Sequence, residues 1–112
     1  MSAGFRYRDE VYWGTNGAVE LCLETLRDLA LDRHAGDPEL ARFFGDERES
    51  FFSGAVVELG PVTANAELRA KTARLFARAM AVLGAPEGGL TAYGRDWVAS
   101  ELARLERALL AG

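Results

Sequence analysis

The chain has 112 residues, of which 49% are apolar and 27% are charged, and its formal net charge is −4 at pH 7. This length and composition predict one globular domain with a modest core and exclude wholesale disorder. No apolar run is long enough to span a membrane, and the first residues lack the apolar stretch of a signal peptide, so we expect a cytoplasmic protein.

The first predicted element is a strand or extended arm over residues 5–13, FRYRDEVYW. Aromatic and β-branched side chains that alternate at a period of two residues are typical of a strand. Apart from Asp9, which breaks the pattern, the alternating set is Phe5, Tyr7, Val11 and Trp13. The segment GTNG at 14–17 then ends this element.

A helix is predicted over residues 17–33, because its apolar side chains converge on one side at 100° per residue. Cys22, the only cysteine, lies on that side, so we expect a buried thiol and no internal disulfide. Like charges four residues apart destabilise a helix by about 0.2–0.5 kcal/mol per pair. The opposite side nevertheless carries four carboxylates at this spacing, here called the acidic stripe: Glu20, Glu24, Asp28 and Asp32.

A second helix is predicted over residues 38–52. Asp37 is suited to cap its N-terminus, and Pro38 favours the first helical position. Residues 55–59, AVVEL, are too short for a good helix and are expected to form a second short strand beside residues 5–13 or a buried connector. A two-stranded ribbon is marginal alone, so it would have to pack on helices.

Two further helices are predicted over residues 65–83 and 92–110, each with one broad apolar face. None of the four helices could bury its apolar face alone, so packing against one another is the economical arrangement. The predicted fold is therefore mainly α, a compact bundle of about four helices with a short extended N-terminal arm.

Motifs for catalysis, metal binding and nucleotide binding are missing. One cysteine and one histidine cannot build a zinc site, the glycine-rich segment at 84–89 lacks the lysine of a P-loop, and no serine has a Gly-x-Ser-x-Gly context. We therefore expect no metal, no cofactor and no enzymatic activity.

A short row of basic residues lies on the third predicted helix, at Lys71, Arg74 and Arg78. A nucleic-acid-binding protein usually shows a larger basic patch, so binding of nucleic acid is disfavoured. We interpret the row as surface charges or as pairing partners for the acidic first half of the chain.

The acidic stripe predicts an interaction surface for a basic protein partner. Leu21 and Leu31 lie among the acids as apolar anchors inside a charged rim, as interfaces tend to have. The second helix would extend this surface if the first two helices form an antiparallel hairpin. The predicted partner-binding residues are Glu20, Leu21, Glu24, Asp28, Leu31, Asp32, Asp46, Glu47 and Glu49.

In size, charge and lack of catalytic motifs the chain resembles small bacterial immunity proteins. This resemblance is one of general character, and it implies an acidic protein that neutralises a basic toxin. A helix face that is simply solvated explains the same charges, since most charged runs on helices are solvated.

Two further alternatives stay open at this point. The first is a small-ligand or enzymatic pocket between the N-terminal arm and the start of the fourth helix, lined by Trp13, Tyr93, Arg95, Asp96 and Trp97. These large aromatics are also suited to anchor the core. The second is a subunit of a homo-oligomer that associates through Leu21, Leu31 or the pairs Phe43/Phe44 and Phe51/Phe52, and the sequence does not fix the oligomeric state.

Overall fold

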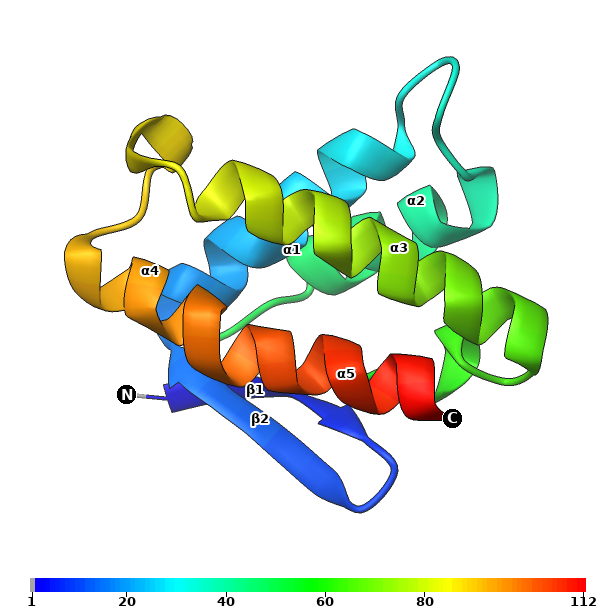
Figure 1. Cartoon of the computed structure of the whole chain (residues 1–112), viewed down its shortest axis with the longest axis horizontal. Helices are drawn as coiled ribbons and strands as arrows, with labels where there is room; N and C mark the ends of the chain where they lie inside the picture. Colours follow the sequence, from blue (N-terminus) through cyan, green and yellow to red (C-terminus); the bar gives the residue numbers. More distant parts are fainter. Residues whose placement is uncertain (1) are drawn as a thin grey trace.

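A three-stranded mixed sheet lies against a layer of helices in the computed structural model, which describes residues 2–112 (Figure 1). Strand β1 (Ser2–Tyr7) is central, with β2 (Glu10–Thr15) antiparallel on one side and β3 (Val56–Glu58) parallel on the other. The fold is therefore α+β.

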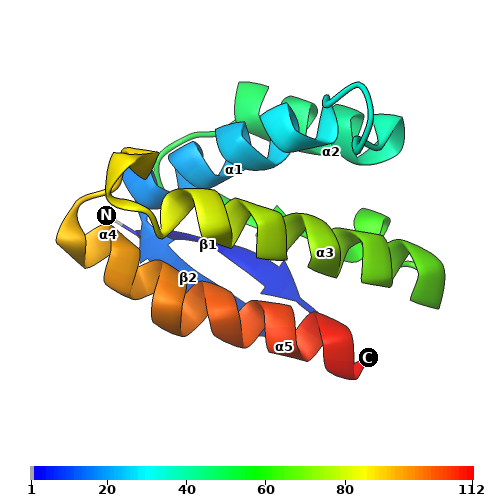
Figure 2. The same cartoon turned by 45° about the horizontal axis from the view of Figure 1, so that its top comes forward.

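The helices are α1 (Asn16–Ala30), α2 (Pro38–Glu49), α3 (Ala66–Leu83), α4 (Ala92–Trp97) and α5 (Ala103–Ala111). A π-helical turn, Val98–Leu102, joins α4 to α5, and short 3₁₀ turns cover Gly60–Val62 and Pro86–Gly88. Figure 2 shows α1 and α2 on one side of α3, and α5 on its other side. No helix within residues 2–112 is long and apolar enough to cross a membrane.

The predicted mainly α bundle with an extended arm is wrong, because residues 5–13 belong to a hairpin within a three-stranded sheet. Tyr7 pairs with Glu10, so the chain reverses within the two residues Arg8 and Asp9. Asp9 interrupts the alternation because it belongs to this turn. Beyond the turn the buried position shifts by one residue, to Tyr12, while the Trp13 side chain is half exposed.

Residues 55–59 provide the third strand, the first of the two expected alternatives. Residues 4–6 of β1 pair in parallel with residues 56–58, and the Gly4 amide donates to the carbonyl of Ala55 at 3.1 Å. The sheet gains a third strand in this way, and its inner face contributes Phe5 and Val57 to the core.

The helix starts follow from local capping chemistry. Thr15 accepts a hydrogen bond from the Ala18 amide at 3.2 Å, and Asp37 accepts from the amides of Glu39 and Leu40. The first two predicted helices end earlier than expected, at Ala30 and Glu49, and the fourth is interrupted by the π turn.

Aromatic rings from the sheet and two helices meet in the core. Phe5 of β1 packs edge-on against Phe76 of α3 at 5.3 Å between ring centroids, and Phe76 meets Phe44 of α2 at 6.0 Å. Cys22 of α1 is fully buried in the same core, and burial raises the pKa of its thiol. The core therefore links the sheet to the helices.

Candidate functional site

The first two helices lie side by side, and one arginine connects them across the acidic stripe. The Arg48 guanidinium of α2 bonds the carboxylate of Glu24 at 2.6 Å and that of Glu20 at 2.8 Å. Two of the four stripe carboxylates are therefore paired within the chain, so less of their charge is available to a partner.

The other two stripe carboxylates also have partners inside the chain. Asp28 pairs with its neighbour Arg27 at 3.0 Å. Asp32 lies beyond the end of α1 and accepts hydrogen bonds from the amides of Ala35 and His34, both at 2.8 Å. These two bonds lower the pKa of the Asp32 carboxyl. Asp32 thus stabilises the α1–α2 loop.

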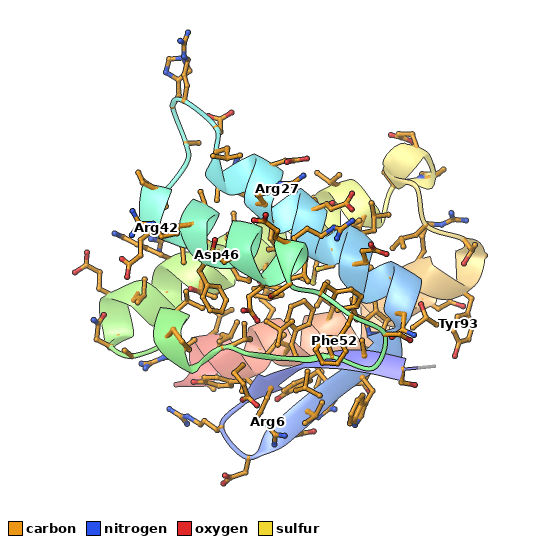
Figure 3. All side chains as sticks on the ribbon, turned by 180° about the vertical axis from the view of Figure 1, so that it is seen from behind. Arg6, Arg27, Arg42, Asp46, Phe52 and Tyr93 are labelled. Carbon is orange, nitrogen blue, oxygen red and sulfur yellow. The ribbon has the colours of Figure 1, made fainter. Side chains whose placement is uncertain are left out.

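The remaining predicted acids lie on α2. Asp46 and Glu49 are exposed, whereas Glu47 is half-buried, and burial together with the neighbouring charge of Asp46 raises its pKa. Arg27 and Arg42 lie on the same α1–α2 face as Asp46, which Figure 3 turns toward the viewer. A shallow groove of about 620 Å³ on this face contains three acidic and three basic side chains: Glu24, Asp46, Glu49, Arg27, Arg42 and Arg48.

A cavity of about 330 Å³ opens between β2 and the segment formed by α4 and the π turn; we call it the β2–α4 cleft. It brings together four of the five predicted pocket residues, namely Trp13, Tyr93, Asp96 and Trp97. Arg95 does not line the cleft, because its side chain points back to the loop and donates to the Leu90 carbonyl at 3.0 Å. Ser100 and Glu101 of the π turn line the cleft as well and were missed from the sequence.

The floor of the cleft is rigidly built. The Trp97 indole is buried and donates its N–H to the backbone carbonyl of Trp13 at 2.9 Å. Thr91 caps α4 by accepting from the Gly94 amide at 3.1 Å, which fixes the start of the helix. The cleft therefore exists as a formed depression in the unliganded chain.

The rim of the cleft combines exposed aromatic rings with a free carboxylate. Trp13 is 50% exposed and Tyr93 is 73% exposed. Asp96 is exposed, and its carboxylate has no hydrogen bond or ion pair to any other residue in the range 2–112. Glu101, by contrast, is bound by Arg104 at 2.8 Å. Asp96 is thus the carboxylate of the cleft that is open to a ligand.

A second depression, of about 280 Å³, adjoins the cleft and shares Thr15, Tyr93 and Gly94 with it. It reaches Leu21 of α1, one of the two apolar anchors predicted for a partner surface. Tyr93 projects from this end of the molecule in Figure 3. The two candidate sites predicted from the sequence are therefore neighbours. The other anchor, Leu31, is 64% exposed.

Three of the four phenylalanines that were considered for self-association pack in the core or against it. Phe44 is fully buried, Phe43 packs edge-on against it at 5.0 Å, and Phe51 packs partly buried against the core. Phe52 is 67% exposed and lies near the sheet in Figure 3. One ring of the four is therefore open to a second copy.

Residues 2–112 contain no group of three His, Cys, Asp or Glu side chains arranged to hold a metal ion. Comparison of the chain with protein-family models, curated proteins and solved structures gives no match. The functional assignment therefore depends on the geometry of the cleft and the surfaces beside it.

Proposed function

We propose that this chain is a binding domain for a basic protein partner, and that the partner places a cationic side chain in the β2–α4 cleft. The observation behind this proposal is the unpaired carboxylate of Asp96 beside the exposed rings of Trp13 and Tyr93.

This combination of groups suits an arginine or lysine side chain. Aromatic faces attract a cation through the ring quadrupole, and the planar guanidinium both stacks on rings and pairs with a carboxylate. A volume of about 330 Å³ lies at the lower end of the usual range for ligand pockets, about 300–1,000 Å³. It therefore suits a side chain better than a large cofactor.

The residues at the rim are those that commonly dominate binding energy at protein interfaces. Tryptophan and tyrosine are enriched among such residues, which lie in central pockets surrounded by weaker contacts. The depression leading to Leu21 offers an adjoining apolar contact. We infer that the cleft is the centre of the interface and that the α1–α2 surface forms the outer part of that interface.

The net charge of −4 would attract a basic partner over a distance. The acidic residues of α1 and α2 contribute to this attraction, but the three on α1 already have partners inside the chain. They are expected to affect the association rate more than the lifetime of the complex. A basic toxin neutralised by an immunity-type protein is one partner with this chemistry.

The two tryptophans of the chain, Trp13 and Trp97, both line the cleft, so intrinsic fluorescence reports on it directly. Titration with N-acetyl-arginine amide should give a saturable fluorescence change. The neutral isostere N-acetyl-citrulline amide should give none. Asp96→Asn should weaken arginine binding by about 10-fold, because it removes the charge-assisted pairing.

Asp9→Asn is the matched control, since Asp9 is an exposed aspartate of the β1–β2 turn that lines neither the cleft nor the α1–α2 groove. It should leave arginine amide binding unchanged. Equal responses to arginine and citrulline amides would refute the proposal, and so would unchanged binding by the Asp96 variant.

A further inference from the structure

A basic cavity of about 310 Å³ lies between the α1–α2 loop and α3, and it shares no lining residue with the β2–α4 cleft. Lys71, Arg74 and Arg78 line it from α3, and Ala35 and Gly36 line it from the loop. Positions i, i+3 and i+7 lie along one face of a helix, so the three cations converge on the same space.

The three basic side chains differ in how far they are paired within the chain. Arg74 is exposed and has no ion pair or hydrogen bond to another residue in the range 2–112. The Lys71 ammonium lies 3.5 Å from the carboxylate of Asp37 and 3.6 Å from that of Glu67. Arg74 is therefore the unpaired cation of the row, whereas the charge of Lys71 is shared with two carboxylates.

Arg78 is positioned by the backbone of the loop. Its Nη1 donates to the carbonyl of Ala35 at 3.0 Å, which orients the guanidinium at the edge of the cavity. Asp37 is the one acidic residue in the lining, and its carboxylate caps α2 through the amides of Glu39 and Leu40. The lining thus holds three cations and one carboxylate, and that carboxylate is engaged by two backbone amides and by Lys71.

We propose that this cavity binds a small ligand through a phosphate group. A phosphate dianion can accept several hydrogen bonds at once from two guanidinium groups and an ammonium. Leu40 and Leu75 provide apolar walls for the rest of a small ligand. The volume fits a compound of metabolite size and is too small for a large macromolecular segment.

The test is a titration of the full chain with inorganic phosphate at constant ionic strength, followed by ¹H–¹⁵N NMR. Saturable shifts are expected for the amides of residues 35–37 and 71–78. Arg74→Gln should weaken this binding by about 10-fold, because it removes a bidentate cation. Arg107→Gln, which removes an exposed arginine of α5 outside the cavity, should leave it unchanged.

A parallel titration with glycerol 3-phosphate distinguishes the two sources of the phosphate group. Tighter binding of the ester identifies an esterified ligand, and equal affinities identify free phosphate. Shifts that do not saturate, or equal affinities in the parent chain and the Arg74 variant, would overturn the proposal. This readout does not involve the tryptophans, so it is independent of the test of the cleft.

Discussion

The indole N–H of Trp97 is bonded to the backbone carbonyl of Trp13 at 2.9 Å, across 84 residues of sequence. Gly14, the residue that follows Trp13, makes this contact geometrically feasible. A Cβ atom at position 14 would lie 2.6 Å from two atoms of the Trp97 ring. The glycine thus allows the indole to pack directly on the backbone of β2 and form the floor of the cleft.

Gly14→Ala should therefore destabilise the fold and disturb the cleft. We expect the free energy of unfolding to fall by about 1–3 kcal/mol, as for other overpacked sites, and the tryptophan emission to shift. Urea unfolding followed by circular dichroism measures the first effect. Gly17→Ala is the control, because its added Cβ meets no atom within 4 Å apart from the adjoining backbone of its own helix. An alanine at position 14 that is tolerated as well as one at 17 would contradict this account.

The hairpin turn contains a residue with a strained backbone conformation, Arg8. Its φ of +57° is unfavourable for a residue with a Cβ, whereas glycine adopts it freely. The Arg8 guanidinium also lies 5.1 Å from the centre of the Tyr7 ring, which offsets part of the cost. Arg8→Gly should be more stable than Arg8→Ala by about 1 kcal/mol, since both lose the ring contact and only alanine keeps the strain. Equal midpoints of thermal unfolding would count against this.

This turn also explains why the hairpin of β1 and β2 escaped prediction. The usual sequence signal for a two-residue hairpin loop is Asn-Gly or Asp-Gly, and Arg8–Asp9 contains no glycine. The alternation of aromatic residues continues through it almost undisturbed, so the two strands looked like one. The helix starts were predictable, because Asp37 and Pro38 act within a single turn of chain.

The candidate site was also predictable only in part. The grouping of Trp13 with Tyr93, Asp96 and Trp97 came from residue chemistry, and the structure places all four in one cleft. The partners of the acidic stripe could not be predicted, because the position of Arg48 depends on how α2 packs against α1. That packing is set by tertiary contacts rather than by the spacing of the carboxylates.

Arg48 is expected to stabilise the α1–α2 pair modestly. Its two ion pairs are partly exposed, so Arg48→Gln should lower the free energy of unfolding only slightly at low salt, because solvent screens such pairs. The loss should shrink in 1 M sodium chloride, where the screening length is about 3 Å. Urea unfolding at both salt concentrations checks this. Arg42→Gln, an exposed arginine of the same helix, should have little effect at either concentration.

Asp32 gives the fold a defined dependence on pH. Hydrogen bonds from the amides of Ala35 and His34 hold its pKa below the ordinary value of 3.8. A carboxyl whose pKa is lowered by folding contributes stability above its unfolded pKa, and this contribution disappears as the pH falls through the folded pKa. The Asp32→Asn variant has no ionisable carboxyl at this position, so it lacks this contribution to stability at every pH. The parent chain should therefore exceed the variant in stability at pH 7, and the gap should narrow as the pH falls below about 4. Urea unfolding at a series of pH values measures the gap, and a difference that stays constant from neutral to acidic pH would mean that the Asp32 charge does not hold the loop.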